Sequence, residues 1–230
     1  MINAIAPLLL LLAAAPGSET AAESRHQPSA TPISWEFEIS FLDPRPIEVL
    51  LPGQKQPEVF WYMVYTATNT SGRRQQFFPM FQIVTEDLRV INTDMAISPT
   101  VFDAIAARHK TTHPYLVPPT KAIGALLAGD DEARESVAIW RQVDLSLNNF
   151  SVYIAGLSGE TRFVRNPSYD ADKPETVTVQ ADNGREREVT INPPYFALRK
   201  TLEVRYTLPG SPRAAYEALP ERGEVLWTMR

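Results

Sequence analysis

Two histidines, His109 and His113, have the spacing of metal ligands. Residues four apart place two imidazoles on one face of a helix, which is the geometry of many zinc sites. A zinc protease would also need a Glu directly after the first histidine, and Lys110 stands there instead. We therefore expect ordinary histidines near the end of a helix, and no metal or cofactor.

Carboxylates and one serine supply the other candidate chemistry. Asp170, Asp172 and Glu175 are close enough along the chain to bind calcium, but the glycine and distal glutamate of an EF-hand loop are absent. The sequence of residues 156–160 is similar to the motif that places a nucleophilic serine in a tight turn, although its second glycine comes one residue early. Glycoside hydrolysis needs two carboxylates at a suitable separation, and the chain has 27 Asp and Glu residues. A secreted carbohydrate hydrolase is therefore our alternative to a non-enzymatic protein.

The apolar segment 59–68 offers a binding surface rather than a reactive group. Phe60 and Tyr62 would point to one side of an extended strand. Trp61 and Tyr65 would point to the other side. If one side were exposed, its aromatic rings would form a flat platform for sugars or peptides. If the strand were central and covered on both faces, no such platform would be exposed. We predict these four aromatic residues as the candidate binding site.

Alternation of apolar and polar residues predicts antiparallel β structure. Residues 33–41 alternate strictly, which indicates a strand with one buried face. Residues 77–85 are expected to return as the antiparallel partner of strand 59–68, with an interruption at Pro79. Further strands are expected at residues 136–141, 150–155, 161–164, 177–180, 186–191, 196–208 and 225–229.

Many short strands with a single short helix indicate a mainly β protein. The helix is expected near residues 100–110, with Thr100 as its cap and Asp103 in the capping-box position. We predict an antiparallel β-sandwich, for which an immunoglobulin-like topology is one option. Residues 33–230 are expected to form a single β-sandwich domain.

The first residues of the chain predict export. Residues 4–15 form an uncharged apolar run with the length of a signal-peptide core, too short to cross a bilayer. Cleavage after Ala22 would make residues 1–22 the signal peptide and leave residues 23–32 as a disordered leader. We therefore expect a periplasmic or secreted protein with no transmembrane anchor in the mature chain.

Composition excludes several function classes. The chain has no Cys, so it can use neither disulfides nor thiolate catalysis nor Cys-ligated zinc. Its formal net charge is −5, and its basic residues are scattered rather than gathered in a stripe. Nucleic acid is therefore not an expected partner.

Five segments carry a resemblance to known sequences: residues 44–49, 60–72, 137–144, 152–161 and 198–210. Together they resemble a planctomycete-type family of exported bacterial β-sandwich proteins of unknown function. The resemblance implies export but assigns no ligand and no catalytic residue. We predict an exported, non-enzymatic module that binds a partner or has a structural role, with an envelope glycan or protein as the expected partner.

Overall fold

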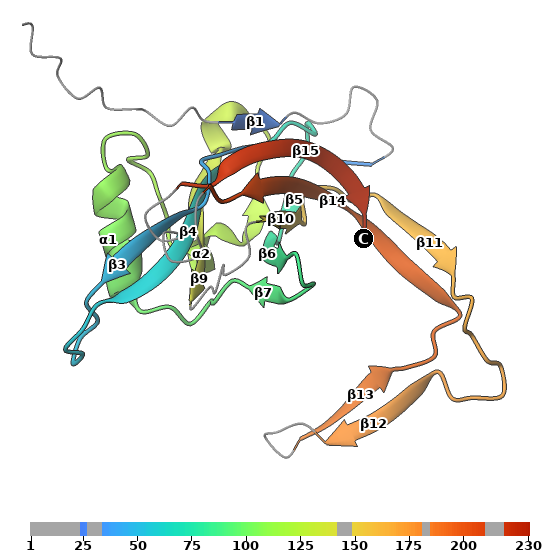
Figure 1. Cartoon of the computed structure of the whole chain (residues 1–230). Helices are drawn as coiled ribbons and strands as arrows, with labels where there is room; N and C mark the ends of the chain where they lie inside the picture. The colour runs from blue at the N-terminus through green and yellow to red at the C-terminus, as the bar shows by residue number, and fades with distance from the viewer. Residues whose placement is uncertain (1–23, 27–33, 142–148, 181–184, 210–218) are drawn as a thin grey trace, which may run out of the picture.

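The structure is a computed structural model that describes residues 24–26, 34–141, 149–180, 185–209 and 219–230. The predicted signal peptide lies outside these residues. As the sequence predicted, the protein is mainly β, with antiparallel sheets that pack as a sandwich (Figure 1). An immunoglobulin-like topology and a single domain stay predictions.

The first sheet is organised around β4 as its central strand. Its members are β1 (Ser24–His26), β2 (Phe37–Phe41), β3 (Arg45–Val49), β4 (Glu58–Asn69) and β9 (Arg134–Arg141). β2 and β3 follow each other along one edge of β4, and β9 pairs with the other edge. β4 therefore has hydrogen-bonded neighbours on both sides along most of its length.

The second sheet has the order β15-β14-β10-β6-β7. Its members are β6 (Met80–Thr85), β7 (Val90–Asn92), β10 (Asn149–Ala155), β11 (Thr161–Arg165), β14 (Tyr195–Thr207) and β15 (Glu221–Met229). β14 is long enough to pair first with β11 and then with β10 along the same edge. The part of β14 that pairs with β11 extends beyond the sandwich.

One face of each sheet is buried in a shared core. The first sheet contributes Trp61 and Trp140, which stand opposite each other in the β4–β9 ladder. The second sheet contributes alternate residues of β6, β10 and β14, among them Ile83, Val152 and Leu202. Full burial of a large apolar side chain stabilises a fold by roughly 1.5–3 kcal/mol. This core therefore holds the two sheets face to face.

A helix covers the other face of the first sheet. Val101 and Ile105 of α1 (Pro99–His109) are buried in a second apolar cluster with side chains of β3, β4 and β9. The remaining short elements are α2 (Pro119–Ala122), β5 (Gln75–Phe77), β8 (Gly124–Leu126) and the 3₁₀ turn Asp130–Glu132. No helix in the part of the chain that the structure describes is long and apolar enough to cross a bilayer.

Three local predictions need correction. The helix begins at Pro99, so Ser98 and not Thr100 takes the N-cap position, and no side chain caps the helix. The chain changes sheets at Pro79, so β6 pairs with β10 and β7 instead of β4. Ser24–His26 were expected in a disordered leader, but they pair with β2 as strand β1 because the outer edge of β2 is open to them.

The chain leaves the sandwich after β10 and projects as a long arm, of which the structure describes residues 161–180 and 185–199 (Figure 1). Its first part, the root ladder, is β11 paired with Tyr195–Arg199 of β14. Its second part, the tip hairpin, is β12 (Thr176–Gln180) paired with β13 (Glu186–Thr190). The hairpin folds back from the end of the ladder, so the arm has the form of an open hook.

Candidate functional site

The four aromatic residues predicted as a binding platform lie in the core instead. Trp61 and Tyr65 belong to the cluster between the sheets. Phe60 and Tyr62 belong to the cluster beneath α1. The alternation of faces was predicted correctly, but both faces are covered, and all four residues are at most 2% exposed. The predicted platform is therefore wrong, and the candidate surface lies elsewhere.

His109 is held by a tyrosine. Its Nε2 lies 3.0 Å from the Tyr62 hydroxyl, and Arg108 donates to that hydroxyl at 3.3 Å. His113 lies beside it, with ring centroids 5.7 Å apart, and its Nδ1 lies 3.0 Å from the Thr112 hydroxyl. Within the described residues, no three His, Asp or Glu side chains are close enough to share a metal ion.

Burial of His109 gives the fold a pH dependence. Removal from water, together with the nearby cation of Arg45, lowers the pKa of His109 to about 4, from an ordinary value of 6.5. Below pH 6.5 the unfolded chain therefore binds a proton that the native state does not bind. We expect the free energy of unfolding to fall by roughly 2 kcal/mol between about pH 6.5 and 4. Denaturant titrations should show a shallower fall for His109→Gln, and equal slopes would contradict this explanation.

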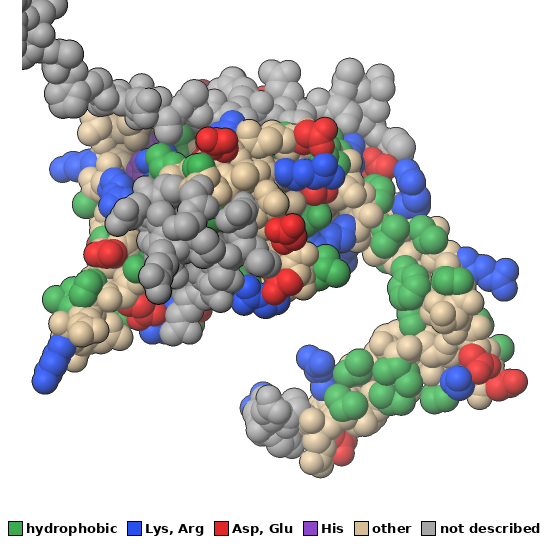
Figure 2. Space-filling view, viewed as in Figure 1, with side chains coloured by type: hydrophobic (Ala, Val, Ile, Leu, Met, Phe, Trp, Pro, Cys, Tyr) green, Lys and Arg blue, Asp and Glu red, His purple; other side chains and the backbone are tan. Residues whose placement is uncertain are grey.

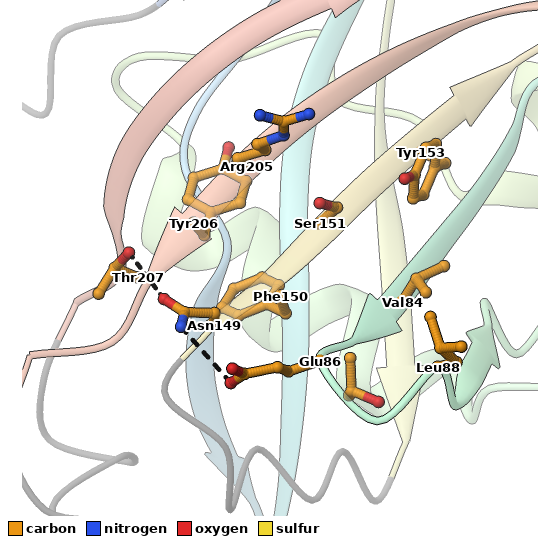
Figure 3. Close-up of a pocket in the computed structure, with 11 residues that line it drawn as sticks. Val84, Glu86, Leu88, Asn149, Phe150, Ser151, Tyr153, Arg205, Tyr206 and Thr207 are labelled. Carbon is orange, nitrogen blue, oxygen red and sulfur yellow. Dashed lines mark hydrogen bonds between the residues drawn. The ribbon is translucent and has the colours of Figure 1, made fainter. Parts of the chain in front are cut away.

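The outer face of the second sheet has a shallow hollow of about 350 Å³ (Figure 3). Asn149 donates to the Glu86 carboxylate at 3.4 Å and accepts a hydrogen bond from the Thr207 hydroxyl at 3.1 Å. Glu86 is the one carboxylate among the lining residues. This hollow therefore lacks the second acid that glycoside hydrolysis needs.

A second hollow, of about 340 Å³, lies where the arm leaves the sandwich, and we call it the root groove. Trp35, Phe78 and Met80 give it apolar walls. Phe78 is 59% exposed and Met80 is 48% exposed. Thr161 and Arg199, which also line the groove, are cross-strand partners in the root ladder. The groove therefore joins an exposed apolar part of the sandwich to the arm.

Two glycines let the chain pass close to the wall of the root groove. A Cβ at Gly156, where φ is +83°, would lie 2.2 Å from the carbonyl oxygen of Phe78. A Cβ at Gly159 would lie 2.4 Å from the indole nitrogen of Trp35. In sequence, residues 156–160 are similar to the turn around a nucleophilic serine. In the structure they join two strands, β10 and β11. Ser158 is buried, and its hydroxyl accepts the backbone N–H of Glu160. The segment is therefore a structural turn.

The root ladder exposes large apolar side chains on both faces. Cross-strand partners share a face, and so do residues two apart along one strand. Phe163 and Tyr195 therefore lie on the same face as Thr161 and Arg199, which line the root groove. Phe163 is 71% exposed and Tyr195 is 58% exposed. On the opposite face, the exposed apolar residues are Val164 and Phe196.

The tip hairpin has no core of its own. Val177, Val179 and Val189 share one of its faces, and every described residue of both strands is at least partly exposed. Figure 2 shows hydrophobic side chains gathered along the arm. A ribbon two strands wide is marginally stable in water. The hairpin therefore gains little from burial within its own chain.

The bend between ladder and hairpin is fixed by two buried asparagines. Asn166 donates to the carbonyl of Pro193 at 2.8 Å and accepts from the backbone N–H of Ser168 at 2.9 Å. Asn192 donates to the carbonyl of Asp170 at 2.7 Å and accepts from the N–H of the same residue at 3.1 Å. These bonds tie the two passes of the chain together. The arm therefore has a specified bend although it has no core.

A buried ion cluster anchors β14 where the arm begins. The Lys200 ammonium contacts the Glu36 carboxylate and lies 3.5 Å from the Glu160 carboxylate. The Glu36 side chain is 0% exposed and that of Lys200 is 12% exposed. The ammonium also lies 5.0 Å from the ring centroid of Trp227. The two carboxylates thus meet across a buried cation.

The arrangement of carboxylates bears on the hydrolase alternative. No carboxylate lines the root groove. Of two smaller hollows, one has Asp94 as its single carboxylate and the other has Glu48. Glu36 and Glu160 come together in the structure, but neither lines any of these four hollows. None of the four therefore carries the pair of acids that the alternative requires.

Sequence reasoning missed the arm as a candidate surface. It predicted strands near residues 161–164, 177–180 and 186–191 and assigned all of them to the sandwich. A signal was present, because the apolar residues of the two later segments are all aliphatic, with no aromatic side chain, and one of their neighbours on the same face is Arg187. Such strands have little to contribute to a sandwich core.

Comparison with family models, with curated proteins and with solved structures found no match to this chain. The resemblance to a planctomycete-type family therefore stays a prediction. The candidate site rests on the geometry of the root groove, the root ladder and the tip hairpin.

Proposed function

We propose that the protein is an exported, non-enzymatic binding or structural module, and that the arm is its binding surface. The observation that carries the proposal is an arm with a fixed bend but no core. Phe163 and Tyr195 face solvent on a ladder whose bend is held by the side chains of Asn166 and Asn192. Ordered apolar surface of this kind is typical of contact with a partner.

The root groove supports the same proposal. Its apolar walls continue directly into the exposed face of the root ladder, so a partner could contact both at once. Arg199 supplies a cation at the junction, and no carboxylate lines the groove. An envelope protein or glycan with apolar and acidic groups fits this surface better than a substrate of acid-base catalysis.

Export is the second part of the proposal. The apolar run at residues 4–15 supports a signal peptide, and the absence of Cys is compatible with folding outside the cytosol without disulfides. Fractionation of cells that produce the protein should find the shortened chain in the periplasm or the medium. Intact precursor in the cytosol would overturn this part.

Deletion of the outer arm tests the binding surface. Arg165 and Tyr195 are cross-strand partners, so an Asn-Gly turn can join them and close the root ladder without residues 166–194. We expect the shortened protein to keep its melting temperature within a few degrees, because the deleted residues lie outside both apolar clusters. We expect its retention on immobilised envelope polysaccharide and envelope protein fractions to fall at least about tenfold.

A matched control removes residues 52–56, an exposed turn between β3 and β4 that lies away from the arm (Figure 1). This variant should be retained like the full chain. Equal retention of the arm-deleted and full-length proteins would contradict the assignment of the arm. Release of reducing sugar from the polysaccharide by the full chain would contradict the non-enzymatic reading.

A further inference from the structure

One face of the root ladder combines cations with aromatic rings. Residues two apart on a strand and cross-strand partners share a face, so six side chains lie on the side that lines the root groove, and we call this surface the groove-side face. All six are exposed: Thr161, Phe163 and Arg165 of β11, and Tyr195, Ala197 and Arg199 of β14. The groove-side face thus has two guanidinium groups, two aromatic rings and no carboxylate.

Both arginines of this face lack an anionic partner within the described chain. Neither Arg165 nor Arg199 forms a salt bridge with any residue that the structure describes. The carboxylate of Glu160, which directly precedes Thr161, is held by the Lys200 ammonium at 3.5 Å. An exposed guanidinium without a partner can bind an anion from another molecule, and its planar fork fits a carboxylate through two hydrogen bonds.

The large side chains of this face surround a small one. Ala197 has Phe163 opposite it on β11, with Tyr195 and Arg199 on either side of it along β14. The backbone N–H of Arg199 donates to the Arg230 carbonyl, away from β11, so these cross-strand pairs are the non-hydrogen-bonded ones. Side chains are closest in such pairs, whose Cα atoms are about 4.5 Å apart. A flat ligand unit over Ala197 would thus contact two rings and a guanidinium.

The root groove continues this face with neutral polar groups. Gln76 supplies an amide and Thr161 a hydroxyl beside the apolar walls of the groove. The ladder adds roughly 13 Å, which is the length of the four steps from Thr161 to Arg165 along an antiparallel strand. A surface of this length suits a linear ligand with several repeating units.

The tip hairpin repeats the combination of cation and apolar side chains. The face of its three valines also carries Arg187, the cross-strand partner of Val179, and no carboxylate. Arg187 is exposed and forms no salt bridge with a described residue. Glu186 and Glu188 lie on the opposite face. Each part of the arm therefore has one face with arginine beside apolar side chains and without an acid.

We propose that the arm and the root groove bind a linear acidic polysaccharide whose sugar units carry carboxylates. On the ladder, sugar rings contact Phe163 and Tyr195, and their carboxylates pair with Arg165 and Arg199. One unit of such a chain has apolar C–H groups, hydroxyls and a carboxylate together, which match the three kinds of group on this surface. An acidic peptide distributes these groups over separate residues, so it fits less closely. The inference rests on the proposed function, since it names the partner of the same surface.

Calorimetric titration of the whole chain tests the class of ligand. The probes are two polyuronates, polygalacturonate and alginate, each in its ionised form and as an ester. The ester keeps the sugar chain but removes its charge. We expect at least one ionised polyuronate to bind about tenfold or more tightly than its ester, and this binding to weaken as the ionic strength rises.

Single substitutions on the two faces of the ladder test the groove-side face. Arg165→Gln and Arg199→Gln should each weaken polyuronate binding about fivefold, whereas Arg162→Gln, on the opposite face, should change it less than about twofold. In the same way, Phe163→Ser should weaken binding about fivefold, and Phe196→Ser, on the opposite face, should not. These side chains are exposed, so all the variants should keep the melting temperature of the parent.

The tip hairpin offers a similar pair of substitutions. Arg187→Gln should account for part of the loss of binding that follows deletion of the outer arm. Glu188→Gln, on the opposite face of the hairpin, should not weaken binding.

Several results would overturn the inference. Equal binding of the ionised and esterified chains would do so, as would equal effects of the substitutions on the two faces of the ladder. Polyglutamate that binds as tightly as the polyuronates, through the same arginines, would replace the polysaccharide by an acidic peptide and still support the arm as the binding surface. If neither polyuronate binds while deletion of the outer arm lowers retention on envelope protein fractions, the inference fails and the proposed function stands.

Discussion

Replacement of Lys200 by Met is expected to lower the free energy of unfolding by about 3–5 kcal/mol. The Glu36 carboxylate is fully buried against the Lys200 ammonium, so removal of the ammonium leaves a negative charge in the interior without this cation. Glu160 lies 3.5 Å from the same ammonium and adds a second carboxylate to the site. In a chain of 230 residues the loss corresponds to a fall in melting temperature of roughly 10 °C.

Two comparisons separate the buried charge from the loss of a lysine side chain. Adding Glu36→Gln to Lys200→Met removes the buried negative charge as well as the cation and should recover at least half of the lost stability. Lys173→Met breaks an exposed ion pair with Asp170, at 3.2 Å, and should change stability by less than about 0.5 kcal/mol. A Lys200→Met protein that unfolds within about 1 kcal/mol of the parent would contradict the prediction.

Gly156→Ala is the second substitution with a large expected effect, about 3 kcal/mol or more of destabilisation. The new Cβ would lie 2.2 Å from the Phe78 carbonyl oxygen. The carbonyl belongs to the backbone, and the position of the Cβ is fixed by the backbone of residue 156. Neither can move without shifting the turn that joins β10 to β11. The φ of +83° adds the usual strain of a non-glycine residue in the left-handed region.

Gly72→Ala supplies the matched control. Its φ is +74°, close to that of Gly156, but a Cβ there would have no atom within 4 Å. It should therefore show the conformational strain alone, about 1 kcal/mol. Denaturant unfolding of both variants gives the cost of the close contact as the difference between them. Equal destabilisation would show that the turn absorbs the extra methyl group.

The central strand could be predicted from the sequence because its pattern is local. Apolar residues on both faces of residues 59–68 indicated burial on both sides, and β4 has neighbours on both edges and covered faces. Its pairing could not be predicted in the same way. Residues 77–85 were assigned to it by proximity in the chain, but Pro79 lies where the chain passes from one small ladder to the other sheet.

The aromatic platform was a wrong prediction for a related reason. Composition shows that Trp61 and Tyr65 are large and apolar, but exposure depends on what covers them. The second sheet covers one face, and α1, which begins 30 residues after the end of β4, covers the other. Which elements pack together is a property of the tertiary fold, so the periodicity of one strand could not decide it.

The arm shows the converse case. Its strands were predicted near their observed positions, since alternation is enough to find a strand. That the tip hairpin folds back from the root ladder follows from the bend at Asn166 and Asn192, whose side chains donate to backbone carbonyls 27 and 22 residues away. Such contacts leave no periodic signal.

Because of the bend, the arm is expected to be more susceptible to proteolysis than the sandwich. A protease needs several residues of accessible, extended chain, which the arm provides and the packed sheets do not. Cleavage near Asn166 and Asn192 would release the outer segment and leave both apolar clusters intact. A molecule whose arm stays uncovered would thus lose the outer arm to a protease, while an arm covered by a partner would be protected.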